Sequence, residues 1–257
     1  MIESPKNQRI KDLIKLREGK NRRKLGLFTL EGDREIERAL ASSFKINEVF
    51  VCESRLSSLG ASILSQVDKS PIFVSEQVFQ KIALRESVGG IVATAFPKEY
   101  SLSDLEHSDS PFLIVVESVE KPGNLGAILR TADGVGADAV VVLDPKADVF
   151  NPNSIRSSLG AAFSVPTIVC DTDQFLSFSQ SNKIQLVAAS PHSDKSYTAV
   201  NYKVGTAIIL GSEAHGLSDV WEDSSNTVKI PMLGVCDSLN VSVSAAILAY
   251  EVLRQRS

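Results

Sequence analysis

The sequence predicts an α/β protein in two parts, in which a smaller N-terminal unit precedes a larger domain with a parallel sheet. Segments of helical and strand character alternate along 257 residues, a length that suits two domains. Nearly continuous apolar runs in the second part, FLIVV, AVVVL and AIIL, are typical of parallel strands covered on both faces. A polar stretch with a proline near each end, residues 96–111, separates the parts. We therefore expect domains over residues 1–105 and 106–257.

The N-terminal part is expected to open with a basic helix over residues 6–23. Residues 1–24 carry nine Lys and Arg against three acidic side chains, whereas the rest of the chain carries 18 basic and 28 acidic residues. A basic helix on an otherwise acidic protein attracts phosphates locally. The alternative is a solvated helix face or a flexible tail. The further elements predicted here are strand 25–30, helix 32–41, strand 46–51, helix 58–67, strand 72–74, helix 76–83 and strand 90–95.

The second part is expected to alternate strands with helices. The predicted strands are 112–117, 139–143, 164–168, 185–189, 206–210 and 227–230. The predicted helices are 124–134, 151–159, 171–180, 214–221 and 239–255. Crossover helices between successive strands favour a parallel sheet.

Composition excludes several classes of protein. Three cysteines and three histidines are scattered along the chain, which indicates reduced thiols and no metal site. No apolar run approaches the roughly 18–20 residues that span a bilayer, and the first residues lack the apolar core of a signal peptide. We expect a cytoplasmic protein with no membrane partner. The chain also has no GxGxxG, GxxxxGK[ST] or GxSxG motif, which argues against NAD-linked enzymes, P-loop NTPases and hydrolases.

The most informative segment is ESVEKPGNLGAILRTADGVG, residues 117–136. A buried strand runs into a turn at Pro122 and Gly123, and Asn124 is the predicted N-cap of the following helix. Apolar residues at helical spacing give that helix a buried face, and Arg130 lies on another face. This arrangement suits an anionic or hydroxyl-bearing substrate. The alternative is an ordinary strand–helix unit with a solvated arginine.

Two further junctions between a loop and a helix carry polar residues. In IILGSEAHGL, Gly211 and Gly216 follow a buried strand and allow close backbone approach to a ligand. Glu213 could orient a substrate or help take a proton, and the alternative is an acid that caps a helix. In KIPMLGVCDSLNVSVSAAILAYEVLRQR, Ser238 is the predicted cap of the last helix. Asn240 is a poor helix former in the first turn, which indicates either a functional or a capping role.

Together the three segments resemble the SpoU (TrmH-like) branch of the SPOUT RNA methyltransferases. NLGAILRTADGVGAD resembles its motif 1, LGSEAHGL its motif 2 and IPMLGVCDSLNVSVSAAILAYE its motif 3, in the family's order. SPKNQRIKDLIKLREGKNRRKLGLFTLEGDREIERAL looks like the substrate-binding domain that precedes many such enzymes. The resemblance implies a SPOUT-type domain with a parallel sheet and a deep trefoil knot. It also implies a homodimer whose active site lies near the subunit interface.

The resemblance further implies an S-adenosylmethionine-dependent enzyme that methylates a ribose 2′-hydroxyl of RNA. By position, the catalytic residues would be Asn124, Arg130, Glu213, Ser238 and Asn240. The residues around the cofactor would be Leu210, Gly211, Gly216, Ile230, Met232 and Leu239. The basic N-terminal segment would contact RNA phosphates through Lys6, Arg9, Arg22 and Arg23.

A chemical argument refines the expected role of Arg130. A guanidinium stays charged in proteins, so Arg130 is a poor base. We expect it to grip a phosphate and orient the 2′-hydroxyl, with Asn124 and Asn240 holding Arg130 and Glu213 in place. The substrate implied is 23S ribosomal RNA. The alternatives are transfer RNA, a catalytically silent RNA-binding or ribosome-assembly module on the same fold, and methylation that protects the ribosome from an antibiotic.

Overall fold

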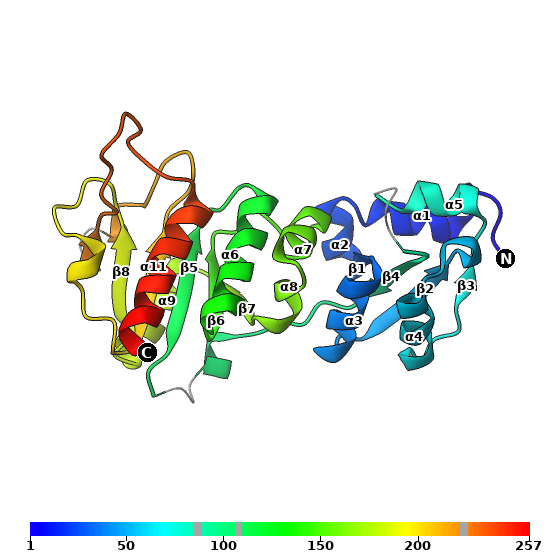
Figure 1. Ribbon diagram of the computed structural model, residues 1–257, viewed down its shortest axis with the longest axis horizontal. Helices are drawn as coiled ribbons and strands as arrows, with labels where there is room; N and C mark the ends of the chain where they lie inside the picture. The colour runs from blue at the N-terminus through cyan, green and yellow to red at the C-terminus, as the bar shows by residue number, and fades with distance from the viewer. Residues whose placement is uncertain (85–88, 106–108, 222–225) are drawn as a thin grey trace. The chain divides into compact units, whose positions relative to one another are not determined.

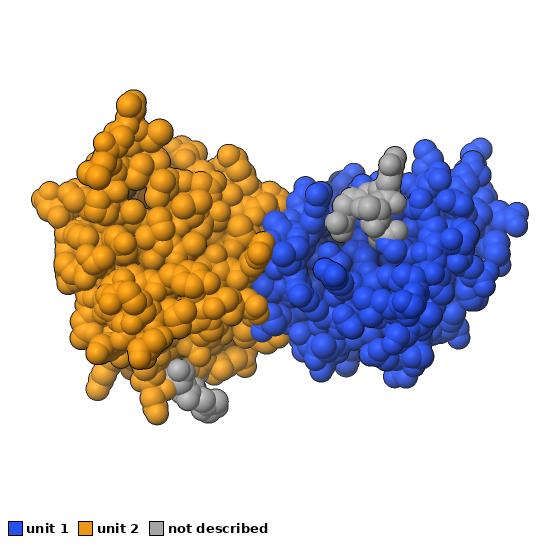
Figure 2. All heavy atoms as spheres, in the orientation of Figure 1, with its two compact units in different colours: residues 1–98, 150–164 blue, residues 99–149, 165–257 orange. Residues whose placement is uncertain are grey.

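The computed structural model describes residues 1–84, 89–105, 109–221 and 226–257 (Figure 1). The chain divides into two compact units, shown in Figure 2. Unit 1 holds residues 1–98 and 150–164, and unit 2 holds residues 99–149 and 165–257. The boundary expected between residues 105 and 106 falls beside residues 106–108, which lie outside the described part of the chain.

Unit 1 is built on a four-stranded sheet with the order β1-β4-β2-β3. β4 is antiparallel to both β1 and β2, and the short β3 is parallel to β2. The strands are β1 (Phe28–Glu31), β2 (Ile46–Val51), β3 (Ile72–Phe73) and β4 (Ile91–Ala95). The helices are α1 (Gln8–Lys15), α2 (Gly19–Leu25), α3 (Asp33–Ala41), α4 (Ser58–Gln66), α5 (Glu76–Ile82), α7 (Pro152–Ser158) and α8 (Ala161–Ser164), with a 3-10 turn η1 (Glu53–Arg55).

The single basic helix predicted over residues 6–23 is wrong, because α1 ends at Lys15 and α2 begins at Gly19. The Arg22 guanidinium holds this break, since its Nη1 donates to the carbonyl oxygens of Leu16 at 2.7 Å and Arg17 at 2.8 Å. The segment is not a flexible tail either. Ile10 and Leu13 on α1 are buried in a cluster with residues of β2 and α5. The first helix is therefore part of the core of unit 1.

Residues 150–164 belong to unit 1 because they complete its aromatic core. Phe150 stacks on Phe28 with ring centroids 4.4 Å apart, and Phe163 meets Phe44 edge-on at 5.2 Å. Aromatic pairs of this kind add to the stabilisation from burial alone. This packing also explains a displaced strand: residues 161–164 form α8, so the strand predicted at 164–168 begins at Thr167 instead.

Unit 2 contains a six-stranded sheet with the order β10-β8-β9-β5-β6-β7, and every strand pair in it is parallel. The strands are β5 (Phe112–Glu117), β6 (Ala139–Leu143), β7 (Thr167–Cys170), β8 (Gln185–Ala189), β9 (Thr206–Leu210) and β10 (Asn226–Val228). The helices are α6 (Pro122–Val135), α9 (Thr172–Ser181) and α11 (Val241–Arg256), with 3-10 turns η2 (Leu102–Leu105) and η3 (Tyr197–Ala199). The predicted mixed α/β fold with a parallel sheet is confirmed.

The helix predicted over 214–221 is wrong for most of its length. Residues 213–215 form a turn, closed by a bridge between Ser212 and Gly216. The apolar face predicted for α6 is correct, and Gly126 is buried with it. α6 and α11 pack against one another beside the sheet (Figure 1).

The strand order brings two of the predicted junctions together. From β5 the chain proceeds outward to β6 and β7 on one side, whereas β9 pairs with β5 on the other side. In parallel α/β sheets, ligands bind outside the carboxyl ends of the strands where the order reverses in this way. Val116 of β5 is paired with Leu210 of β9, so the segments that follow these two residues emerge side by side.

Candidate active site

A chain of side-chain amides joins all three junctions. The Asn240 Nδ2 donates to the Asn124 Oδ1 at 3.2 Å, and the Asn124 Nδ2 donates to the Glu213 Oε1 at 2.6 Å. These residues are 89 and 116 positions apart in sequence, and they come from α6, the turn after β9 and the start of α11. The amide chain therefore fixes the relative positions of three segments at the carboxyl end of the sheet.

The caps of α6 and α11 differ from those predicted, and this explains why the amide chain can form. Lys121, not Asn124, is the N-cap of α6, which leaves the Asn124 side chain free of a capping bond. Asn240, not Ser238, is the N-cap of α11: its Oδ1 accepts from the backbone N–H of Ser242 at 2.9 Å and from the Ser242 hydroxyl at 2.7 Å. With Oδ1 so used, the amide group of Asn240 is turned to offer Nδ2 to Asn124.

Glu213 is held as a carboxylate. Burial alone would raise its pKa, but hydrogen bonds from Asn124 and from the backbone N–H groups of Glu213, Glu120 and Lys121 outweigh burial and lower the pKa below the ordinary value. A carboxylate with a lowered pKa is a weak base, so Glu213 is better suited to hold Asn124 than to accept a proton.

Arg130 does not join this network. It is exposed on α6 and makes no hydrogen bond or ion pair with any residue that the structure describes. At six positions from Asn124, it lies about 9 Å further along the helix and roughly 120° around it. The expectation that Asn124 and Asn240 hold Arg130 is therefore wrong, and the amide chain holds Glu213 alone. The Arg130 guanidinium keeps its donors available.

Ser238 is exposed and lies apart from the amide chain. Its hydroxyl donates only to the neighbouring Asp237 Oδ1, at 3.4 Å. Residues 233–240 are all exposed, and Leu233 and Val235 have no cover at all, at 100% and 105% of their reference accessibility. The loop before α11 thus presents apolar side chains to its surroundings.

The residues predicted around a cofactor lie in two segments. After β9, the backbone passes so close to itself that a Cβ on Gly211 would stand 2.1 Å from the carbonyl carbon of Gly216, and Gly216 itself has a φ of +70°. Leu210 is buried, with 2% of its surface exposed. After β10, Ile230 and Met232 are half-buried and Leu239 is exposed.

Sequence reasoning missed a residue that secures the second junction. Glu117, the last residue of β5, accepts from the Ser218 backbone N–H at 3.0 Å and from the Ser218 hydroxyl at 2.6 Å. It ties the segment after β9 to the end of β5. The signal in the sequence is an acidic residue directly after the apolar run FLIVV, where a parallel strand leaves the core.

The four predicted RNA contacts have different environments. Lys6 and Arg23 are exposed, and Arg9 is exposed with an ion pair to Glu48 at 3.7 Å. Arg22 is 5% exposed and uses its guanidinium on the carbonyls at the end of α1. Its burial argues against contact with RNA and for a structural role.

Two further findings concern the described residues only. No group of three or more His, Cys, Asp or Glu among them could hold a metal ion. No helix within the described ranges is long and apolar enough to cross a membrane.

A parallel sheet whose strand order reverses beside β5, with a polar cluster at that switch point, places the chain among the α/β proteins whose ligand sites typically lie at the carboxyl ends of the strands. Sequence comparison supplies the family. A model of the SpoU rRNA Methylase family matches residues 111–250, and a model of the MRM3-like substrate binding domain matches residues 7–93. The chain belongs to the SpoU rRNA methylase family, as its three motifs predicted.

Individual relatives agree along the whole chain. The 23S rRNA (guanosine(2553)-2'-O)-methyltransferase RlmP of Bacillus subtilis is 31% identical, over 98% of each chain. A crystal structure of an RNA 2'-O ribose methyltransferase is 39% identical with a TM-score of 0.86, over 99% of this chain and 98% of the other. The SpoU methyltransferase AviRb of Streptomyces viridochromogenes, solved in complex with the cofactor AdoMet, is 27% identical with a TM-score of 0.91, over 98% of each chain.

Proposed function

We propose that this protein transfers a methyl group from S-adenosylmethionine to a ribose 2′-hydroxyl of 23S ribosomal RNA. The observation that carries the proposal is the amide chain from Asn240 through Asn124 to Glu213, because it assembles all three family motifs into one site. Relatives that match along the whole chain act on 23S rRNA, and one binds the same cofactor.

The segments after β9 and β10 fit the cofactor. Gly211 and Gly216 pack backbone against backbone and so form a tight turn after Leu210, and Met232 and Leu239 offer apolar surface of the kind that adenine and a methionine chain need. When bound, S-adenosylmethionine supplies an electrophilic methyl group. We propose that Gly211, Gly216, Ile230, Met232 and Leu239, with the backbone of Leu210, hold it. We propose that the segments after β9 and β10 form the deep trefoil knot that the family resemblance implies.

Arg130 is proposed to position the RNA. Its guanidinium is exposed and has no partner among the described residues, so it can bind a phosphate with two parallel hydrogen bonds. In that position it orients the neighbouring 2′-hydroxyl for in-line attack, and positioning alone accounts for much of the acceleration of such a reaction. The proton of the hydroxyl passes to water or phosphate, since the lowered pKa of Glu213 makes it a poor acceptor.

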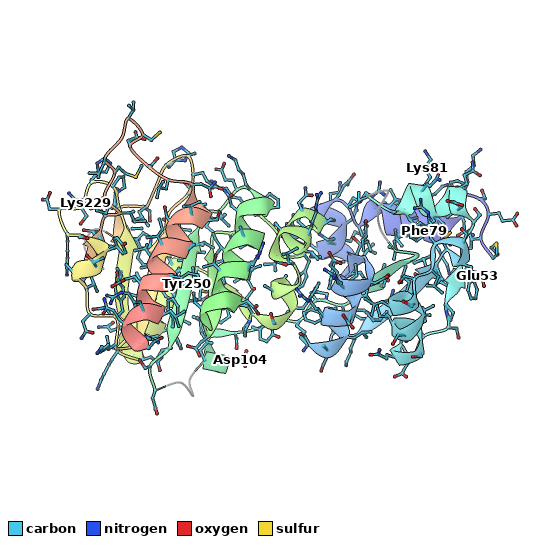
Figure 3. The ribbon with its side chains drawn as sticks, in the orientation of Figure 1. Glu53, Phe79, Lys81, Asp104, Lys229 and Tyr250 are labelled. Carbon is cyan, nitrogen blue, oxygen red and sulfur yellow. The ribbon has the colours of Figure 1, made fainter. Side chains whose placement is uncertain are left out.

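The working form is proposed to be a homodimer. Val243 and Tyr250, seven positions apart on α11, expose 46% and 53% of their surface. Tyr250 lies over Gly134 of α6, where a Cβ would be 3.3 Å from its hydroxyl (Figure 3). A second copy that covers this apolar face would also approach Arg130, which lies one helical turn before Gly134. A cytoplasmic location follows from the proposed substrate.

The test is methylation of 23S rRNA transcribed in vitro, with the modified nucleotide mapped on the product. We expect Arg130→Ala and Arg130→Lys to bind S-adenosylmethionine like the wild type and to lose most turnover, since lysine cannot reproduce a two-point grip. Arg34→Gln, which removes an exposed charge from α3, is the matched control and should retain turnover. Near-normal methylation by the Arg130 variants would refute the role.

The same assay separates the alternatives. Transfer of the methyl group to tRNA but not to 23S rRNA would make the protein a tRNA enzyme. Failure of the wild type to bind S-adenosylmethionine would favour a silent RNA-binding module. Altered antibiotic resistance in cells that lack the gene would indicate a protective role for the methyl group.

A further inference from the structure

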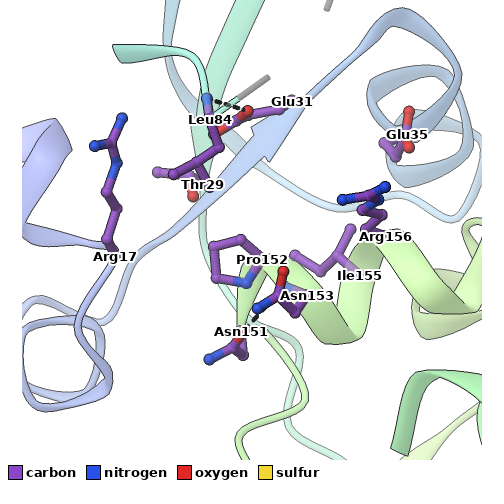
Figure 4. Close-up of a pocket in the computed structure, with 10 residues that line it drawn as sticks. All are labelled: Arg17, Thr29, Glu31, Glu35, Leu84, Asn151, Pro152, Asn153, Ile155 and Arg156. Carbon is purple, nitrogen blue, oxygen red and sulfur yellow. Dashed lines mark hydrogen bonds between the residues drawn. The ribbon is translucent and has the colours of Figure 1, made fainter. Parts of the chain in front are cut away.

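Unit 1 contains a pocket of about 300 Å³ that the catalytic site does not use (Figure 4). Every residue that lines it belongs to unit 1, although the lining comes from distant parts of the sequence: the α1–α2 break, β1, α3, the segment after α5, and α7 with the residue before it. Its size is at the lower end of the range for pockets that bind small molecules, and it suits one aromatic base.

The pocket offers both donors and acceptors. Its charged lining residues are Arg17, Arg156, Glu31 and Glu35, two of each sign. Arg156 is exposed and makes no bond with the described residues, while Arg17 is anchored because its Nη2 donates to the carbonyls of Lys81 at 2.8 Å and Ile82 at 3.0 Å. The lining therefore offers guanidinium donors and carboxylate acceptors within one pocket.

Two buried polar atoms in the lining residues have no partner among the described residues. One is the Thr29 hydroxyl, on a side chain that is 4% exposed, and the other is the Arg17 Nε. A buried polar atom that lacks a hydrogen bond destabilises the folded state. The presence of two such atoms in one pocket therefore indicates a ligand that supplies their hydrogen-bond partners. The Glu31 carboxylate beside them is oriented by the Leu84 backbone N–H, which donates to its Oε2 at 2.9 Å.

We propose that this pocket binds an unstacked guanine of the RNA substrate. Guanine presents the acceptors O6 and N7, which suit an arginine, and an exocyclic amine, which suits a carboxylate. A planar guanidinium can also stack on the base. The inference rests on the proposed function for the presence of RNA, and it gives the N-terminal unit a specific nucleotide to recognise.

Binding is tested directly with the full chain and the four nucleoside monophosphates. In ¹H–¹⁵N spectra, GMP at millimolar concentration should shift the backbone amides of Thr29 and Leu84, and UMP and ribose 5-phosphate should bind at least about tenfold more weakly. Equal shifts with ribose 5-phosphate would indicate a phosphate site and overturn the proposal. The absence of shifts with GMP would overturn it too.

Catalysis supplies an independent measurement. We expect Thr29→Val to raise KM for transcribed 23S rRNA by about fivefold and Arg156→Gln by about tenfold, with kcat and cofactor affinity unchanged. Thr29→Val should melt at the wild-type temperature or above, because it removes an unpartnered hydroxyl from the folded chain; a structural role would lower the melting temperature instead. Arg34→Gln, the matched loss of charge outside the pocket, should leave KM unchanged.

The outcomes separate this proposal from the proposed function. Unchanged KM in both pocket variants, or an equal rise in Arg34→Gln, would overturn the guanine site while the enzyme still methylates 23S rRNA. A wild type that methylates no RNA would overturn the function, and the GMP titration would still decide whether the pocket binds a base.

Discussion

Exchange of Asn124 for aspartate tests whether the amide chain organises the active site. The substitution keeps the shape of the side chain but replaces the Nδ2 donor, 2.6 Å from the Glu213 Oε1, with an oxygen. The carboxylates of residue 124 and Glu213 then face one another at the separation that a hydrogen bond bridges in the wild type. The bond from the Asn240 Nδ2 to the Oδ1 of residue 124 can persist, because that atom remains an acceptor.

The magnitude follows from two contributions. A hydrogen bond to a charged group contributes about 1.5–3 kcal/mol, and two like charges about 4 Å apart repel by about 1–4 kcal/mol between aqueous and near-surface dielectric. Both residues are half-buried, so we expect the lower part of the range, a loss of about 2.5–4 kcal/mol in the free energy of unfolding at pH 7. Repulsion raises a carboxyl pKa in the folded variant, so the loss should shrink as the pH falls toward 4 and one group is protonated.

Urea denaturation of a double-mutant cycle measures the effect. In Asn124→Asp with Glu213→Gln, donor and acceptor are exchanged, so a hydrogen bond of the reverse direction can form and most of the lost stability should return. The Glu120 backbone N–H still finds an acceptor in the glutamine oxygen. A coupling energy below about 0.5 kcal/mol, the usual scatter between independent sites, would refute the reasoning.

Three other predictions concern neighbouring features. Gly211→Ala should lower the free energy of unfolding by about 2 kcal/mol or more, because its Cβ would meet the Gly216 backbone at 2.1 Å, while the control Gly123→Ala, with open space at its Cβ, should be neutral or stabilising. The folded pKa of Glu213 is lowered, so the stability it contributes should be present above its unfolded pKa of about 4.3 and lost as the pH falls through the folded value; Glu213→Gln should remove that part of the titration. In a thiol assay, exposed Cys236 should react quickly and be protected by S-adenosylmethionine, whereas Cys170, whose pKa burial raises to about 11, should react slowly; equal rates would contradict this.

The second half of the fold was predictable because its apolar runs are typical of parallel strands that are buried on both faces. Strands β5, β6, β8 and β9 begin and end at the predicted residues. In β5, β6 and β9, runs rich in valine, isoleucine and leucine are buried on both faces of the sheet. The failures lie where a tertiary contact overrides local preference. Residues 161–164 are helical because Phe163 packs in the aromatic core of unit 1, a partner more than 100 positions away in sequence.

The site was predictable as a set of residues but not as a set of contacts. Family motifs identified Asn124, Glu213 and Asn240, and the structure brings these three together. Capping preference alone predicted Asn124 as the N-cap of a helix. In the structure its side chain instead donates to Glu213, which lies 89 positions away and which a local pattern of residue types does not reveal. The same limit explains why Arg130 was expected within the amide chain.

Charge by itself was the weakest guide, and Arg22 shows why. In sequence it is one of nine basic residues in a segment that reads as a phosphate-binding helix. In the structure its guanidinium is buried and bonds two carbonyls that the break between α1 and α2 leaves without helical partners. Because α1 is part of the core, deletion of residues 1–24 would unfold unit 1 and could not report on RNA binding. Substitution of exposed Lys6 and Arg23 by glutamine removes charge without unfolding unit 1. If this segment binds RNA phosphates, the double variant should show a higher KM for RNA and a weaker dependence of RNA binding on salt.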